Sequence, residues 1–101
     1  HLPVMISAGL IATCMSDDPD VLTLAQQLAS SGFRDTSRVG GGNPELGVMM
    51  AQYNRQELLR SLQQYRHNLE ALIHLIEQED WIALEQQLKS TQMERPKFVE
   101  E

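Results

Sequence analysis

The stretch LLRSLQQYRHNLEALIHLI, residues 58–76, decides the fold class of this chain. Its apolar residues recur at steps of four, three, four, three and four, and they are Leu58, Leu62, Tyr65, Leu69, Leu72 and Ile76. This heptad spacing places them along one side of an α-helix. Leu59, Ile73 and Leu75 widen the apolar side. We therefore expect a long amphipathic helix over residues 58–76.

Helical patterns also occupy the rest of the chain. Residues 2–15 are almost wholly apolar or small, which predicts a helix that is buried on most of its surface. Residues 21–29 carry a helical stripe that ends at a Ser-Gly pair. Asn43 and Asp80 are N-cap signals for a short helix and for a last helix. Because no stretch alternates with the period of a strand, we predict an all-α fold, a helical bundle of about five helices.

The apolar surface of these helices is large for a domain of 101 residues. Residues 2–15 and 58–76 could bury their apolar sides within one monomer. They could equally form an interface between two copies, since an obligate interface resembles a domain core cut in half. The sequence leaves both alternatives open, and the prediction that we test is an interlocked homodimer.

Composition and charge exclude several classes of function. Hydrophobic residues make up 42% of the chain and charged residues 22%, which is typical of one globular domain. The net charge of -6 argues against general binding to nucleic acid or to an anionic membrane. No apolar run approaches the length of a transmembrane helix. Cys14 is the only cysteine, so no intrachain disulfide can form, which fits the cytoplasm.

The segment SGFRDTSRVGGGNPELG, residues 31–47, predicts a polar, glycine-rich loop between helices. Arg34 and Arg38 lie in the one basic part of the chain, residues 33–66, which has five arginines against three acids. The two arginines and Asp35 could form a local salt bridge in a flexible connection. Alternatively, the arginines could bind a small anionic substrate, because a guanidinium donates two parallel hydrogen bonds to a carboxylate.

Other site chemistries find no support in the residue pattern. The glycines lack the spacing of a phosphate-binding loop. His67 and His74 lie on the polar flank of the long helical pattern and are expected to be solvated, so we predict no metal site. His1 begins the first helix and could face the arginines, since a helix N-terminus favours anions.

Three segments together resemble the C-terminal helical domain of the prephenate/arogenate dehydrogenase family, the NAD(P)-dependent enzymes of tyrosine biosynthesis. They are HLPVMISAGLI at residues 1–11, GFRDTSRVGGGNPELGVMM at residues 32–50, and the leucine-rich stretch over residues 58–76. The resemblance covers essentially the whole chain, in order. Within the family, the chain is most similar to the arogenate-using, NADP-preferring branch.

The resemblance implies that residues 1–101 are the dimerisation and substrate-binding domain of a larger dehydrogenase. A missing N-terminal Rossmann domain would bind NADP or NAD and carry the catalytic histidine. Hydride would pass from arogenate or prephenate to the nicotinamide, with decarboxylation. The family's HLP histidine corresponds to His1 and its substrate-binding arginine to Arg38, while Arg34 and Asp35 are expected to orient the site. These four residues are the predicted substrate-binding set.

The chain alone is expected to be inactive and to bind no cofactor, because it has no glycine-rich turn after a strand. Gly47 stands where some family members carry an aromatic residue, which leaves the specificity for the substrate's side chain open. The alternative is a free-standing helical interaction module whose residues 58–76 bind a partner helix. A βαβ unit with a glycine-rich turn upstream of His1 would separate the two.

Overall fold

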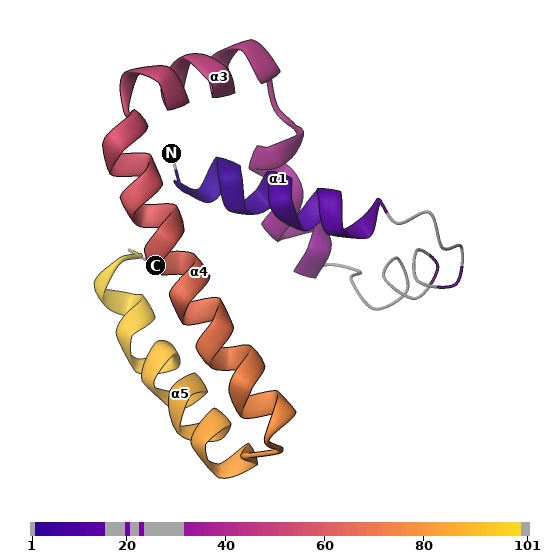
Figure 1. Ribbon diagram of the computed structural model, residues 1–101, viewed down its shortest axis with the longest axis vertical. Helices are drawn as coiled ribbons and strands as arrows, with labels where there is room; N and C mark the ends of the chain where they lie inside the picture. Colours follow the sequence, from indigo (N-terminus) through magenta and orange to yellow (C-terminus); the bar gives the residue numbers. More distant parts are fainter. Residues whose placement is uncertain (1, 16–19, 21–22, 24–31, 100–101) are drawn as a thin grey trace. The chain divides into compact units, whose positions relative to one another are not determined.

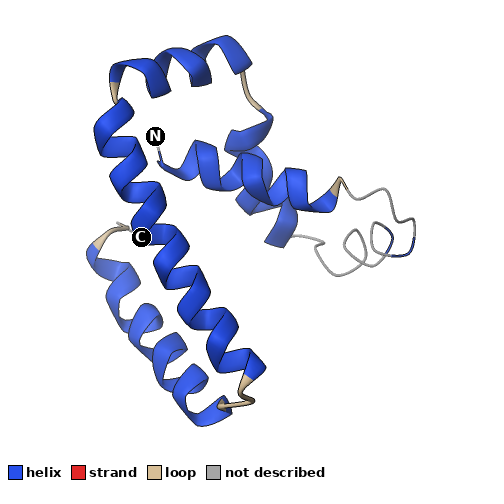
Figure 2. Ribbon diagram, viewed as in Figure 1, coloured by secondary structure: helices blue, strands red, loops and turns tan. Residues whose placement is uncertain are grey.

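The structure, a computed structural model, describes residues 2–15, 20, 23 and 32–99. Over these ranges the chain is helical and carries no strand, so the all-α prediction is confirmed (Figure 2). The elements are α1 (Leu2–Cys14), η1 (Arg38–Gly41), α3 (Pro44–Tyr53), α4 (Arg55–Glu77), α5 (Trp81–Glu94) and η2 (Arg95–Lys97). The helix predicted over residues 21–29 lies outside the described residues.

The chain divides into two compact units, His1–Leu62 and Gln63–Glu101. The first holds α1, η1, α3 and the beginning of α4, and the second holds the remainder of α4 with α5 and η2 (Figure 1). In the part of the chain that is described, no helix combines the length and the apolar character needed to cross a membrane.

The predicted starts of α3 and α5 are confirmed by their caps. Oδ1 of Asn43 accepts a hydrogen bond of 3.0 Å from the backbone N–H of Glu45. Oδ1 of Asp80 accepts one of 3.1 Å from the N–H of Ala83. Each bond satisfies a donor that the first turn of a helix leaves without an intrahelical partner.

α4 ends in a turn that closes its last carbonyl groups. The N–H of Asp80 donates to the carbonyl oxygen of Leu75 over 2.9 Å, and the N–H of Glu79 donates to that of Ile76 over 3.0 Å. This pair of bonds is the Schellman motif, which places one residue in the left-handed region. That residue is Glu79, with a φ of 53°. A glutamate therefore occupies a position that favours glycine.

The long helix is confirmed, but its apolar side stays largely uncovered within the chain. We call the apolar residues at heptad spacing, from Leu58 to Ile76, the α4 seam. Leu58 begins it, is 7% exposed and is the buried hydrophobic residue among those described. Tyr65, Leu69 and Ile76, further along the same seam, are exposed. The described part of one chain therefore does not bury the heptad seam.

α1 forms where it was predicted, with Pro3 in its first turn, where a proline is tolerated. The prediction that most of its surface is buried is not met by the described residues of one chain. Ser7 is its buried residue, whereas Ala8 and Gly9 are exposed. An apolar sequence indicates which surface would gain from burial, but it does not guarantee that the same chain covers it.

The prediction of a glycine-rich loop up to the helix start at Asn43 and Pro44 is wrong for most of its described length. Residues 32–37 are helical, Arg38–Gly41 form a 3₁₀ helix, and α3 begins at Pro44. Gly32 is the first described residue of this helical run, and the helix that it was predicted to end lies outside the described residues. Of the glycines that follow, Gly40 makes a close packing contact, described below.

Candidate functional site

Arg38 and Asp35, two of the predicted substrate-binding residues, lie together at the start of η1. Nη2 of Arg38 donates to Oδ1 of Asp35 over 2.9 Å, and the two side chains are 72% and 70% exposed. Arg34 lies on the preceding helical segment and is also exposed. His1 lies outside the described residues. The structure therefore brings two of the four residues into contact.

The exposed pair of Arg38 and Asp35 stabilises the fold very little, since solvent screens it and such pairs contribute about 0–1 kcal/mol. Its chemical significance lies in orientation. A guanidinium carries five N–H donors in a planar fork, and the contact with Asp35 uses one terminal nitrogen. The remaining donors face solvent and are suited to a ligand carboxylate.

η1 is held against α1 by a contact between Ser7 and Gly40. The N–H of Gly40 donates to Oγ of Ser7 over 2.8 Å, and Ser7 is 1% exposed. α1 and η1 pack closely at this point (Figure 1). A Cβ atom on Gly40 would lie 2.5 Å from the backbone nitrogen of Ala8. We call this the Ser7–Gly40 contact.

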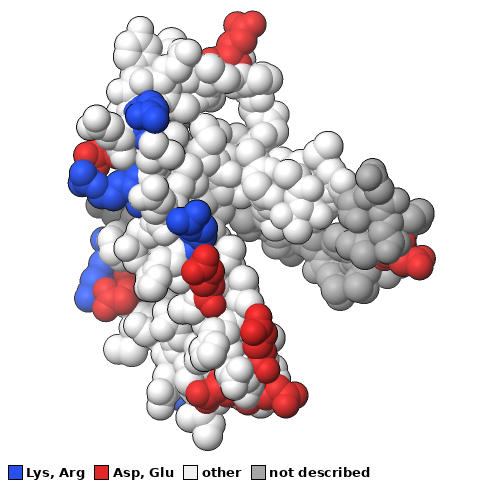
Figure 3. Space-filling view, in the orientation of Figure 1, with Lys and Arg blue, Asp and Glu red and all other residues white. Residues whose placement is uncertain are grey.

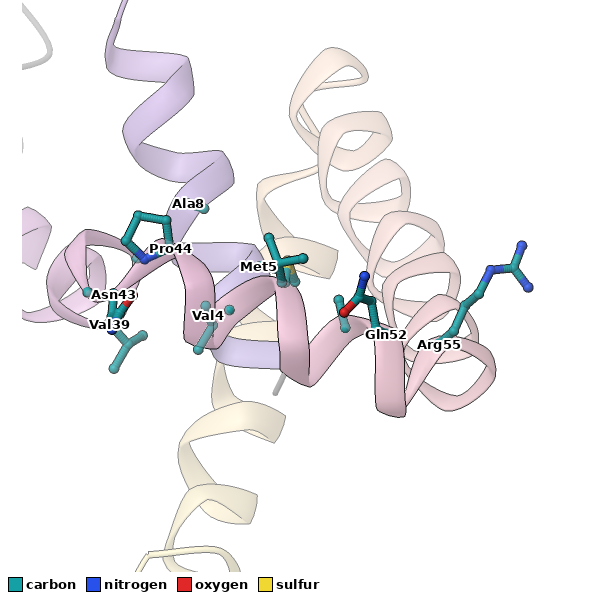
Figure 4. Close-up of a pocket in the computed structure, with 13 residues that line it drawn as sticks. Val4, Met5, Ala8, Val39, Asn43, Pro44, Gln52 and Arg55 are labelled. Carbon is teal, nitrogen blue, oxygen red and sulfur yellow. The ribbon is translucent and has the colours of Figure 1, made fainter.

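A cavity of about 540 Å³ lies beside η1 in the first unit. It is lined by α1, η1, α3 and the first residue of α4 (Figure 4). The residues labelled in the close-up are Val4, Met5, Ala8, Val39, Asn43, Pro44, Gln52 and Arg55. The lining of the cavity is mostly apolar. The side chain of Arg55 extends away from the apolar side chains (Figure 4). Val39 and Gly40, which follow Arg38 directly, belong to it.

Charge is unevenly distributed along α4. On the face shown in Figure 3, acidic side chains gather toward the end of α4 and its junction with α5, and basic side chains lie over its beginning. His67 and His74 of α4 are exposed, as predicted. Within the described ranges, no three His, Cys, Asp or Glu side chains are grouped so that they could hold a metal ion.

Large hydrophobic side chains are exposed along α4 and α5. Those of the two helices are Leu59, Tyr65, Leu69, Ile73, Ile76, Trp81, Ile82, Leu88 and Met93. Large exposed apolar patches on a protein mark interaction sites with other proteins, and exposed apolar side chains this numerous on two helices favour such a role. The arrangement suits association with another helical surface.

Sequence reasoning missed Ser7 and Gly40. The signal was present in part, because a serine interrupts the apolar pattern of residues 2–15 and three glycines follow Val39. A flexible connection is one of the two alternatives that the residue pattern leaves open for these glycines. A contact between residues 33 positions apart leaves no local pattern that would pair them.

Comparison with known proteins identifies the family. The family model described as prephenate dehydrogenase, dimerization domain, matches residues 1–90. The crystal structure of Synechocystis arogenate dehydrogenase is similar with a TM-score of 0.90 and 60% sequence identity, over 98% of this chain and 36% of that chain. The chain thus spans about a third of the length of that dehydrogenase chain. These matches confirm the resemblance drawn from the sequence, and the chain belongs to the prephenate dehydrogenase dimerization-domain family.

Proposed function

We propose that this chain is the dimerisation and substrate-binding part of an arogenate or prephenate dehydrogenase of tyrosine biosynthesis. The 60% identity to Synechocystis arogenate dehydrogenase supports arogenate as the substrate. The reaction removes a hydride and carbon dioxide from the substrate, which leaves an aromatic ring. We assign cofactor binding, with NADP ahead of NAD, and the catalytic histidine to a further domain of the longer protein.

Arg38 is the residue on which the substrate-binding role rests. Its exposed guanidinium, held at one nitrogen by Asp35, is the single observation that carries the proposal. In the proposed site, Arg38 pairs with a carboxylate of the substrate and Asp35 orients the fork. Arg34 adds positive charge nearby, and His1 contacts the substrate from the start of α1.

We further propose that two copies of the chain form an interlocked homodimer. The support is the exposed apolar surface of α4 and α5, which the described residues of one chain leave uncovered. A second copy would bury the seam that begins at Leu58. Obligate interfaces are apolar and large, as such a surface requires. We place the protein in the cytoplasm, where the free thiol of Cys14 stays reduced.

A turnover assay tests the proposed function. The full-length protein is assayed with arogenate and with prephenate, each with NADP and with NAD, and the 101-residue chain alone serves as the control. We expect turnover of at least one substrate by the full-length protein, and neither turnover nor cofactor binding by the chain alone. A full-length protein that oxidises neither substrate would refute the proposal.

A further inference from the structure

We propose that Ser7 and Gly40 are positioning residues for Arg38. Their contact fixes the backbone of η1 on α1, and this sets where the guanidinium of Arg38 meets the substrate carboxylate. The inference rests on the substrate-binding role proposed for Arg38. According to this inference, Ser7 and Gly40 affect the affinity for the substrate without contacting it.

The hydrogen bond is the first support. The N–H of Gly40 reaches Oγ of Ser7 over 2.8 Å, and the serine is 1% exposed. A buried acceptor that loses its donor leaves a polar group without a partner, which is costly in a site closed to water. The pairing of these two groups therefore favours one placement of η1 on α1.

The close approach of the two backbones is the second support. A Cβ atom on Gly40 would lie 2.5 Å from N of Ala8, 2.6 Å from C of Ser7 and 2.7 Å from Oγ of Ser7. Two of these are backbone atoms of a helix, which cannot turn aside as a flexible side chain can. At Gly41 and Gly9, by contrast, an added Cβ atom would meet nothing within 4 Å. The steric requirement for glycine is therefore specific to Gly40.

The link from this contact to Arg38 is short and stiff. Arg38 and Gly40 belong to the same 3₁₀ helix, in which hydrogen bonds join residues three apart. A displacement of Gly40 therefore displaces the backbone of Arg38. The exposed ion pair with Asp35 opposes this displacement only weakly, because such pairs contribute about 0–1 kcal/mol. Since the side chain of Arg38 is 72% exposed, burial does not hold it in place either.

Paired recognition of a carboxylate is sensitive to position. A planar fork matches two carboxylate oxygens only in a narrow range of distances and angles. A misplacement of about 1 Å can lower a reaction rate about 100-fold. The Ser7–Gly40 contact is thus in a position to control the affinity for the substrate through Arg38.

The test uses the full-length enzyme and the substrate that it oxidises. The variants are Gly40→Ala, the matched control Gly41→Ala, and Ser7→Ala, each alone and combined with Arg38→Ala. We expect Gly40→Ala to raise KM for the substrate roughly 10- to 100-fold, with KM for the nicotinamide cofactor unchanged. Gly41→Ala should leave both KM values unchanged.

The double variants separate positioning from general stability. Residues that act as a unit show non-additive effects, whereas independent residues add. If Gly40 acts through Arg38, then Gly40→Ala should have little further effect on kcat/KM once Arg38 is alanine. Effects that add in full would overturn the inference, as would a lower melting temperature with an unchanged KM.

Two further outcomes are distinguishable. If Gly40→Ala does not fold, Ser7→Ala decides by the same criteria, since it removes the acceptor without a clash. If Arg38→Ala alone leaves KM unchanged, the proposed role of Arg38 fails and this inference fails with it. If Arg38→Ala raises KM but neither Gly40→Ala nor Ser7→Ala does, the positioning inference alone fails.

Discussion

The backbone N–H of Gly40 donates to the buried hydroxyl of Ser7, 33 residues earlier in the chain, over 2.8 Å. This one bond joins α1 to the short helix that begins with Arg38. It also explains one of three consecutive glycines. Of the three, only Gly40 lies so close to α1 that an added Cβ atom would clash with its backbone. Gly40 thus serves packing, and its contact brings residues of the two family segments of the first unit together.

The two neighbouring glycines should differ sharply in their tolerance of alanine. Gly40→Ala should lower the free energy of unfolding by about 1–3 kcal/mol, the usual cost of overpacking a tight contact. Gly41→Ala should be neutral or stabilising by up to about 1 kcal/mol, because it reduces the entropy of the unfolded chain. Gly41 does not have a positive φ, so alanine fits there without strain. Denaturant unfolding of both variants measures the difference. Equal changes in the free energy of unfolding would show that Gly40 does not lie so close to the backbone of α1.

The 101-residue chain should be a dimer in solution. The described part of one chain buries Leu58 and leaves the rest of the α4 seam accessible, so a second copy is needed to cover it. One chain has a mass of 11.4 kDa, and sedimentation equilibrium should give twice this mass. A monomer at micromolar concentration would contradict the proposed homodimer.

A charge placed on the exposed apolar side of α4, beside the seam, should weaken that dimer. Ile73→Glu introduces a carboxylate where we propose that α4 meets the second copy, and burying it without a partner is unfavourable. The dissociation constant should rise at least about tenfold, which corresponds to about 1.4 kcal/mol. His67→Glu, on the exposed polar flank of the same helix, adds the same charge and is the control. Equal dissociation constants for the two variants would place the interface elsewhere.

The turn after α4 offers a stabilising substitution. Glu79 has a φ of 53°, a conformation that costs a residue with a Cβ about 1–2 kcal/mol and glycine much less. Glu79→Gly should therefore raise the free energy of unfolding by about 0.5–1 kcal/mol. Glu70→Gly, at an exposed position inside α4, should lower it by about 1 kcal/mol. Thermal melts would show the opposite signs, and a loss of stability in both variants would disprove the strain at Glu79.

Local signals were sufficient to predict most of the described helices. The caps at Asn43 and Asp80 and the heptad seam from Leu58 depend on residues within a few positions of one another, and all three are confirmed. Such signals act through the backbone nearby, so the distant parts of the fold do not alter them. The family resemblance added the identity of Arg38, which spacing alone did not supply.

Tertiary contacts explain where the sequence misled us. Residues 32–42 contain the local signs of a loop, yet residues 32–41 are helical and η1 packs on α1. The expected burial of α1 stays a prediction. The described residues of one chain leave much of this helix accessible, and hydrophobicity does not say whether the same chain or a second copy covers it. The role of Arg38, Arg34, Asp35 and His1 in binding substrate stays a prediction.

The central claim is that Arg38 binds the substrate carboxylate, and kcat/KM of the full-length Arg38→Ala variant tests it most directly. Arg60→Ala is the matched control, since Arg60 forms a similar exposed pair with Glu57, three residues before it, over 3.4 Å. Removing one partner of a desolvated charge pair costs about 2–5 kcal/mol, so kcat/KM should fall at least about tenfold in Arg38→Ala. Arg38→Lys should recover little, because an ammonium group cannot form the paired hydrogen bonds of a guanidinium.

The account predicts that Arg38→Ala loses kcat/KM at an unchanged melting temperature, while Arg60→Ala keeps the kcat/KM of the unaltered enzyme. The exposed pair with Asp35 contributes too little to stability for the melting temperature to fall. If Arg38→Ala instead keeps its kcat/KM and melts at a lower temperature, Arg38 is a structural residue and the account is contradicted.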